Sequence, residues 1–593
     1  MQTAWSSVRD ALRPLTDSAT VAAPQAAWPA IVATLQERDP DVPALVVTAT
    51  ARKAEELLDQ LPTWLDTSVT YLPAWETLPH ERLSPSADIV GNRMAVLHSL
   101  RSSDPPGVVV APLRALMQPL PPDILDTPPQ VFRAGAELDL ADTTASLVQL
   151  GYERCDLVER RGQFAVRGGI IDVFPAHEPH PVRVELWGDE VEEVRSFAVS
   201  DQRMMDTLDR EVLCYPCREL LLTPEVRRRA GELAQQDTPL REELFDLSEG
   251  IFPAGAESLA PLLYGSMSSL AEFLPEGGLV VLAEPAQLEE RSEETLRTAA
   301  EFASAAWSAA GTGGEAPILA GESALLPWPD ISEALTQRCG TLRMLTQFGE
   351  AAADQDAPIR PVGPFQGPGQ AVATVEAAAA AQWRVLVAAT APGPMARLAE
   401  VLAGQGLAVR RGAEEPLYPG VVTVAVGQLS EGFRIPGSGV AVIADSDFSR
   451  RRRNRATQRS KMPSRRRGQV DPLSLQPGDF VVHEKHGVGR FVELTHRESR
   501  GATREFLVVE YAPSKRGFPP DQLFIPSDQL QSVTRYVGGE SPTLSKLGGS
   551  DWAATKGRAR KAVREIAGEL VRLYARRQQS RGHAFAADTP WQA

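Results

Sequence analysis

Cysteine is scarce in this sequence, and the few cysteines do not form a framework. The four are Cys155, Cys214, Cys217 and Cys339, in 593 residues. They are too few and too scattered for a set of disulfides, which agrees with a reducing compartment. Cys214 and Cys217 have the spacing of a zinc or redox pair, but a tetrahedral zinc site needs two more ligands, and no second such pair supplies them. We therefore expect no metal site, and metal or redox work by this pair is the less favoured alternative.

Long apolar runs are missing as well. No stretch approaches the roughly 18 apolar residues that a membrane helix requires. The first residues, MQTAWSSVRDALRPL, lack the charged region and apolar stretch of a signal peptide. We therefore expect a cytoplasmic protein with no membrane contact.

The chain has fewer basic than acidic residues overall. The formal net charge is −16, which argues against a surface that coats nucleic acid, because nonspecific binding is driven by phosphate neutralisation. Residues 450–467 are the exception, with ten basic and no acidic side chains. We interpret this run as a solvated linker, and electrostatic contact with nucleic acid or an acidic partner is the alternative.

A phosphate-binding loop is also absent. Such a loop cradles ATP through glycine amides and places a lysine on the terminal phosphates. The first glycine of the chain is Gly91, and no glycine is directly followed by lysine. No motif of a nucleophilic or metal-dependent hydrolase stands out either. We therefore predict no catalytic residues and no cofactor in this chain, and expect that it neither binds nor hydrolyses ATP.

What the sequence does contain is a multidomain α/β pattern. Its length predicts roughly four or five domains at about 100 to 200 residues each. Residues 44–50 and 108–111 read as buried parallel strands, each followed by a helical pattern, which indicates a RecA-like or Rossmann-like body. From about 136 to 215 the apolar period changes to two, which predicts an inserted antiparallel sheet. Its strands are expected at 164–174, 182–187 and 190–197, with Gly188-Asp189 as a hairpin turn.

The rest of the chain divides into further segments, each with its own secondary-structure pattern. Residues 216–345 are expected to be mostly helical, and the next block repeats the strand-helix-strand logic with strands at 383–389, 421–426 and 440–444. A small β-barrel follows the basic linker. Its strands are expected at 480–482, 489–495, 505–511 and 523–526, with Gly487-Val488-Gly489 as a turn. A helix capped by Ser550 then presents an apolar face at three- and four-residue steps.

Several segments, in their order and spacing, resemble the bacterial transcription-repair coupling factors over essentially the whole chain. The segments are WETLPHERLSP (75–85), IVGNR (89–93), FAVRGGIIDVFP (164–175), VRVELWGDEVEEVRSF (182–197), PGDFVVHEKHGVGRF (477–491) and LSKLGGSDW (544–552). The resemblance implies a UvrB-like module followed by further domains. These would be a degenerate RecA-like domain 1a (1–135), a UvrA-binding domain 2 (136–215), domain 1b (216–345), a third α/β domain of unassigned role (350–452), a basic linker (453–472), an RNA polymerase-interacting, CarD-like barrel of SH3/Tudor type (473–540), a relay helix (550–580) and the start of a translocase (581–593).

The function implied by the resemblance is that of an adaptor in transcription-coupled nucleotide excision repair. Such an adaptor binds the β subunit of stalled RNA polymerase and recruits UvrA, and we expect it to be a monomer. The family's ATP-driven translocase, with its ATP, magnesium and main contact with double-stranded DNA, is expected to follow and is not found in these 593 residues. Two other readings are a stand-alone helicase or ATPase, which the missing phosphate loop disfavours, and a CarD-like transcription regulator, which fits only the barrel.

The resemblance also assigns site residues. By motif, the UvrA contacts fall on Arg167, Arg183 and Trp187, where many members carry phenylalanine in place of the tryptophan. Arg183, Glu185 and Trp187 alternate onto one strand face, and arginine and tryptophan are enriched at interface hot spots. We expect a cationic patch with one apolar anchor, which a later domain of the family covers. Alternatively, Arg183 and Glu185 are surface partners and Trp187 closes the core.

The polymerase contact is assigned to a region instead of single side chains. It comprises Leu494, Thr495, His496, Arg497 and Glu498, with Arg497 standing where a relative has an apolar residue.

Overall fold

The computed structural model divides the chain into two compact units, Met1–Arg453 and Asn454–Ala593, which are described separately. The described residues are 3–77, 83–199, 202–236, 238, 240–310, 325–347, 357–363, 365, 367–448, 480–483, 487–499, 502–513, 520–526, 533–535 and 544–545. Within these ranges no helix is both long enough and apolar enough to span a membrane.

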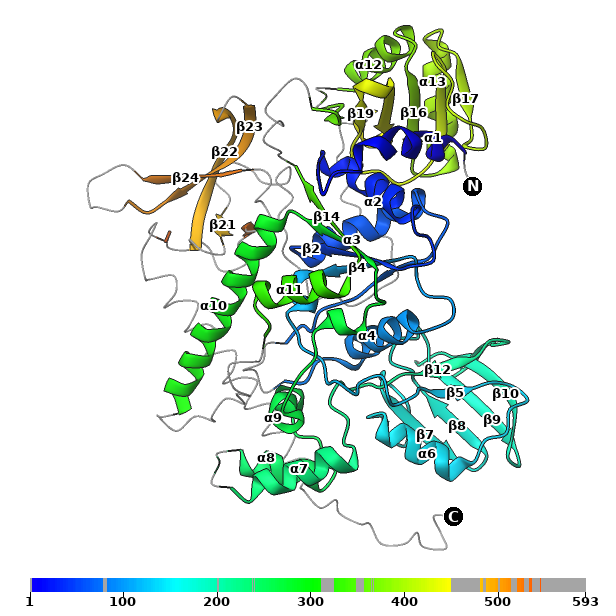
Figure 1. The fold of residues 1–593 in the computed structure, drawn as a ribbon, viewed down its shortest axis with the longest axis vertical. Helices are drawn as coiled ribbons and strands as arrows, with labels where there is room; N and C mark the ends of the chain where they lie inside the picture. Colours follow the sequence, from blue (N-terminus) through cyan, green and yellow to red (C-terminus); the bar gives the residue numbers. More distant parts are fainter. Residues whose placement is uncertain are drawn as a thin grey trace, which may run out of the picture. The chain divides into compact units, whose positions relative to one another are not determined.

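A six-stranded, fully parallel sheet forms the body of the first unit (Figure 1). Its order is β1 (Thr20–Ala22), β14 (Thr341–Thr346), β13 (Leu279–Ala283), β2 (Ala44–Thr48), β4 (Val108–Pro112) and β3 (Val69–Tyr71). On β2, Ala44 and Val46 enter one core, while Leu45 and Val47 enter the other. Because both faces are covered, the central strands read as continuous apolar runs.

Helices cover both faces of this sheet. On one side lie α2 (Trp28–Gln36), whose residues are all buried, and α3 (Ala51–Gln60). The other side is covered by α4 (Ala87–Leu100), α5 (Leu113–Leu116), α10 (Pro285–Ala310) and α11 (Trp328–Arg338).

The predicted strands at 44–50 and 108–111 are confirmed as the adjacent parallel strands β2 and β4. The prediction for 216–345 missed two strands, because β13 and β14 come from this segment and complete the parallel sheet. A short buried apolar run such as 279–283 cannot be told from a buried helical segment by periodicity.

The inserted sheet has six strands in the order β11, β10, β9, β8, β7, β6. Their bounds are β6 (Glu153–Arg154), β7 (Gln163–Arg167), β8 (Ile170–Val173), β9 (Val182–Trp187), β10 (Glu190–Phe197) and β11 (Met204–Thr207). All pairs are antiparallel except β6 with β7. Helix α6 (Leu140–Gln149) and the pair β5 (Gln130–Phe132) and β12 (Val212–Cys214) contribute to the core on one face. The predicted hairpin is confirmed, since Trp187 pairs with Glu190 and Gly188 has a φ of +64°.

A small helical module follows the inserted sheet. It contains α7 (Pro224–Ala234), α8 (Arg241–Ser248) and α9 (Ala260–Tyr264), which surround a core of their own.

A second α/β sheet completes the first unit. Its order is β15 (Arg360–Pro361), β19 (Phe433–Ile435), β20 (Val440–Ala444), β16 (Arg384–Ala389), β18 (Val422–Val426) and β17 (Val409–Arg411). The predicted strands are confirmed as β16, β18 and β20, which run parallel. Helices α12 (Pro368–Ala380) and α13 (Pro392–Gly404) pack on one face, and the other face shares a core with the first sheet.

The amino-terminal helix α1 (Thr3–Leu12) lies at this shared core. The Ala4 amide donates to the Ala413 carbonyl at 3.0 Å, and the Leu417 amide donates to Ser7 Oγ at 3.1 Å. The ring of Trp5 packs edge-on against Trp64, with 4.8 Å between ring centroids. Helix α1 therefore contacts the segment between β17 and β18 of the second α/β sheet directly.

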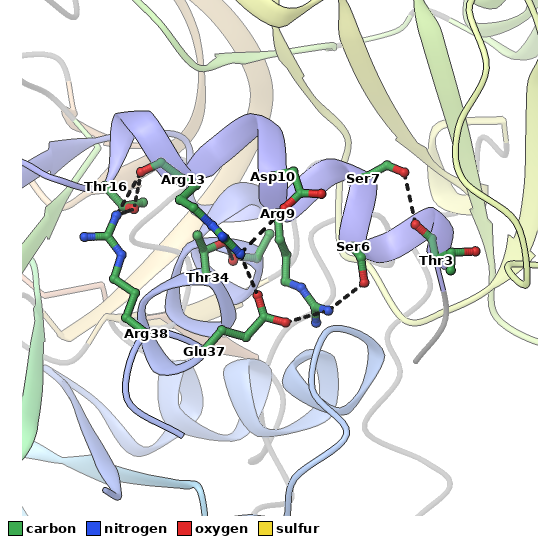
Figure 2. A network of polar contacts seen from close by, with 11 residues as sticks. Thr3, Ser6, Ser7, Arg9, Asp10, Arg13, Thr16, Thr34, Glu37 and Arg38 are labelled. Atoms are coloured by element: carbon green, nitrogen blue, oxygen red, sulfur yellow. Dashed lines mark hydrogen bonds and ion pairs between the residues drawn. The ribbon is translucent and has the colours of Figure 1, made fainter. Parts of the chain in front are cut away.

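A polar network fastens α1 on its other side (Figure 2). Arg9, which is buried, donates to Ser6 Oγ at 2.9 Å and to the Trp64 carbonyl, and it pairs with Glu37 Oε1 at 2.7 Å. Arg38 donates to the Arg13 carbonyl at 2.8 Å. These bonds tie α1 to the end of α2.

The second unit contains a five-stranded antiparallel sheet. Its order is β24 (Asp521–Pro526), β23 (Ala502–Tyr511), β22 (Gly487–Ser499), β21 (Phe480–His483) and β25 (Val533–Arg535). The four predicted strands are confirmed, but the predicted turn at Gly487-Val488-Gly489 is wrong, because these residues begin β22 and pair with β21. Closure into a barrel stays a prediction. The linker 453–472, the helix 550–580 and residues 581–593 lie outside the described residues.

Candidate functional site

The inserted sheet has two chemically different faces. Alternate residues from Phe164 to Val194 point into the core on one side. The opposite side, which we call the outer face, carries residues that the register places in cross-strand rows. They are Arg167, Ile170, Asp172, Arg183, Glu185, Trp187, Glu190, Glu193 and Arg195. The predicted alternation of Arg183, Glu185 and Trp187 onto one face is thus what the structure shows.

Trp187 ends β9 at the tip of the hairpin. Its side chain is 79% exposed. The alternative that it closes the core is therefore wrong. Exposing the large apolar ring of a tryptophan to water is unfavourable. Such exposed aromatic residues are frequent at protein contacts.

Arg183 lies at the centre of the outer face and is held from two sides. Its Nε and Nη2 donate to the two carboxylate oxygens of Asp172, at 2.6 and 2.8 Å. Its guanidinium carbon lies 5.3 Å from the centroid of the Phe197 ring. The hydrogen bonds that Arg183 donates to Asp172 raise the pKa of Arg183 above its ordinary value. The salt-bridge partner of Arg183 is therefore Asp172, not Glu185 as the alternative from the sequence proposed.

Arg167 ends β7 and is exposed. It pairs with Ile170, whose other neighbour across the strands is Glu185, so Arg167 lies one row away from Arg183. Its guanidinium donates to the carbonyl of Asp156. Together with Arg154, Cys155, Asp156 and Val166 it lines a shallow depression of about 390 Å³. The structure thus brings Arg167, Arg183 and Trp187 to one face of one sheet.

The charge of this face differs from the expectation. Arg183 is paired with Asp172, and Arg195 is paired with Glu193 at 2.5 Å. Glu185 and Glu190 add negative charge to the same face. The prediction of a cationic patch is therefore wrong: basic and acidic groups alternate around one exposed tryptophan.

Two residues of the site were missed from the sequence, Asp172 and Phe197. Asp172 is 4% exposed and Phe197 is fully buried. The signal for Asp172 was available, because an acid within the apolar strand Ile170–Val173 requires a buried partner. Nothing local indicates that this partner is Arg183 or that Phe197 lies beneath it.

The predicted polymerase contact lies on β22. Backbone pairing places Leu494, Thr495, His496, Arg497 and Glu498 opposite 503–507 of β23. Strand β21 pairs only with residues 487–490 of β22. Among the strands that the structure describes, the other backbone edge of 494–498 therefore has no neighbour.

The cysteine pair lies in the core beneath the inserted sheet. Cys214 and Cys217 are both buried free thiols, and burial raises the pKa of each. A protonated thiol is a poor metal ligand and a poor nucleophile. In the described part of the chain, no group of three or more histidine, cysteine or acidic side chains is placed to hold a metal ion.

Comparison with known proteins matches both regions to families. Residues 131–219, which contain the inserted sheet, match the UvrB interaction domain. Residues 475–537, which contain the second sheet, match the CarD-like/TRCF RID domain.

Three relatives that match most of this chain share one name. Transcription-repair-coupling factors are 41% identical in Mycobacterium tuberculosis, 31% in Myxococcus xanthus and 28% in Bacillus subtilis. These matches cover 97%, 88% and 92% of this chain and 49%, 45% and 47% of the relatives. The chain therefore spans about half the length of the curated relatives it matches. It is a homologue of the transcription-repair-coupling factors and matches their amino-terminal portion.

Proposed function

We propose that this chain is a two-ended adaptor of transcription-coupled nucleotide excision repair. One end, the outer face of the inserted sheet, binds UvrA through Arg167, Arg183 and Trp187. The other end, residues 494–498 on β22, binds the β subunit of RNA polymerase. The observation that carries the proposal is Trp187, which is 79% exposed within the segment that matches the UvrB interaction domain.

The physical case for the UvrA end rests on the kind of surface that surrounds Trp187. Hot spots are enriched in tryptophan and arginine and lie inside a rim of weaker polar contacts. Here Trp187 supplies the apolar anchor, and Arg183, Glu185 and Glu190 supply polar groups of both signs on the same face. Charges of both signs favour a defined orientation of the partner.

The UvrA end is tested by measuring affinity for purified UvrA with the unmutated chain and with Trp187→Ala, Arg183→Ala and Arg167→Ala. Loss of a central anchor typically costs on the order of 2 kcal/mol, which is roughly a thirtyfold loss of affinity. Phe245→Ala is the matched control, because Phe245 is an exposed aromatic on α8, outside the inserted sheet. Equal affinity for all variants would refute this site, and no binding by the unmutated chain would refute the UvrA end.

The polymerase end rests on backbone geometry. A strand with one open edge can accept a partner strand through main-chain hydrogen bonds. Residues 494–498 are paired on the β23 side alone among the described strands. We infer that the polymerase adds a strand along this edge.

Proline scanning tests the polymerase end in the full chain. Successive amide groups of a strand point to opposite sides, so one of Thr495→Pro and His496→Pro removes an N–H that faces away from β23. We expect the variant that keeps its circular dichroism spectrum to lose retention of RNA polymerase on an affinity column. Undiminished retention by a folded variant of each kind would contradict strand addition.

The family's domain plan is part of the same proposal. Residues 1–135 and 216–345 would be the UvrB-like body, 136–215 the UvrA-binding domain, 350–452 the third α/β domain and 473–540 the polymerase-binding barrel, followed by the relay helix. ATP-dependent DNA translocation would belong to a motor outside these residues. DNA-stimulated ATP turnover by the purified chain would instead favour the helicase reading.

A further inference from the structure

Asp172 occupies an unusual place for a carboxylate. It lies on β8 between Ala165 of β7 and Arg183 of β9, and its strand neighbours Ile171 and Val173 point into the core. Only 4% of the residue is exposed. A carboxylate in such a position destabilises the fold unless a charged partner and hydrogen bonds compensate its desolvation.

The compensation comes from Arg183 on the outer face. Arg183 meets both oxygens of Asp172 in a fork, at 2.6 and 2.8 Å. Its third nitrogen, Nη1, lies 3.9 Å from the sulfur of Met204. The guanidinium carbon lies over the buried ring of Phe197, 5.3 Å from its centroid. All three nitrogens therefore have a neighbour, and the plane of the guanidinium is fixed.

Comparison with a neighbouring arginine shows how strongly Arg183 is constrained. Arg195 lies directly across the strands from Arg183 and pairs with Glu193. That pair is more exposed, with side-chain exposures of 39% and 27%, compared with 21% and 5% for Arg183 and Asp172. Water and dissolved ions compete with an exposed ion pair between flexible side chains. They weaken a bidentate, partly buried arginine–carboxylate pair much less.

We propose that Asp172 is a positioning residue for the UvrA contact, which holds the guanidinium of Arg183 over Phe197 in the orientation that the partner meets. This inference rests on the proposed UvrA end. The side chain of Arg183 is long and would otherwise lose rotamer freedom when a partner binds. Because Asp172 has already fixed it, that entropy is lost during folding and not during binding. The partner surface therefore meets a rigid arginine and an exposed tryptophan on the same strand.

The test is a double-mutant cycle in the full chain, with UvrA affinity and thermal unfolding measured for each protein. Asp172→Asn keeps the shape and removes the charge of the partner, and Arg183→Lys keeps the charge and removes the fork. We expect each to weaken UvrA binding by about tenfold, the effect of one charge-assisted hydrogen bond. In the Arg183→Ala background, Asp172→Asn should cause no further loss. Glu415→Gln is the matched control, because Glu415 also pairs with an arginine that lies over an aromatic ring, Arg410 over Tyr418, but outside the inserted sheet. It should leave affinity within about twofold.

Each outcome decides the matter. Loss of affinity on Asp172→Asn that disappears in the Arg183→Ala background supports positioning, because a general structural defect would appear in both backgrounds. An equal loss in both backgrounds overturns it. Should Asp172→Asn fail to fold, unchanged affinity of Arg183→Lys overturns it. If Trp187→Ala weakens binding and Asp172→Asn does not, the inference fails alone; if neither Trp187→Ala nor Arg183→Ala has an effect, the proposed UvrA site fails and the inference falls with it.

Discussion

Arg93 Nε lies 2.5 Å from Glu219 Oε1, and neither side chain is more than 2% exposed. Arg93 belongs to α4, whereas Glu219 is the last residue of the segment that matches the UvrB interaction domain. The indole nitrogen of Trp75 donates to the same carboxylate oxygen at 3.0 Å. Arg93 also donates to the Pro73 carbonyl at 2.8 Å. This buried pair therefore ties the end of the inserted segment to α4 of the α/β body.

We expect Glu219→Ala to destabilise the first unit strongly. The substitution leaves Arg93 buried without its carboxylate, which typically costs about 3–5 kcal/mol. Urea unfolding followed by circular dichroism measures the change. Glu276→Ala is the matched control, because it removes an exposed pair with Arg338 at 2.7 Å, and such pairs contribute about 0–1 kcal/mol. Equal unfolding midpoints for the two variants would contradict the role of the buried pair.

The contact between α1 and the second α/β sheet predicts a glycine-specific effect. A Cβ atom at Gly427 would lie 2.5 Å from the ring of Trp5, whereas one at Gly437 would meet nothing within 4 Å. Gly427→Ala should therefore lower stability by about 1–3 kcal/mol through overpacking, and Gly437→Ala should not. Thermal unfolding and limited proteolysis report the difference. Identical melting and cleavage of the two variants would show that α1 does not pack as described.

Trp187 and Phe197 should contribute very differently to stability. Trp187→Ala removes an exposed ring and should change the free energy of unfolding by no more than about 0.5 kcal/mol. Phe197→Ala empties a buried position and should cost about 3–5 kcal/mol. Chemical denaturation of both variants tests this contrast. A large loss of stability in Trp187→Ala would mean that this side chain supports the fold and is not a free anchor.

Asp447 predicts a pH effect in the second α/β sheet. Burial, with a smaller contribution from Glu431 and Asp445, raises the pKa of Asp447 to about 6. The folded state holds this proton more tightly than the unfolded state. The protonated carboxyl therefore contributes fully to the free energy of unfolding below the ordinary pKa near 3.8, and this contribution is lost as the pH rises through 6.

Asp447→Asn removes this titration and keeps an acceptor for the Ala444 amide, which lies at 2.9 Å from the carboxylate. We expect the difference in melting temperature, variant minus unmutated chain, to increase between pH 4 and pH 7. Melting curves at several pH values measure it. A difference that stays constant across this range would argue against a raised pKa at this position.

Local chemistry in the sequence determined the strands, the hairpin and part of the site. Apolar runs predicted β2, β4 and β16, because a buried parallel strand needs apolar residues on both faces. Gly188 predicted the turn, because glycine is favoured in two-residue hairpins whose residues have a positive φ, and Gly188 has such a φ in the structure. The period of two placed Arg183 and Trp187 on one face without knowledge of the fold.

Tertiary structure alone decided which side chains meet. Register across β8 and β9 gave Arg183 a partner in Asp172, and an expected cationic patch became a surface of mixed charge. Arg93 and Glu219 are 126 residues apart, and Ser7 and Leu417 are 410 apart. Periodicity reports the face on which a side chain lies, whereas its partner depends on strand register and on loops that bring distant segments together. The exposure of Trp187 was decided in the same way, by the absence of any packed element over it among the described residues.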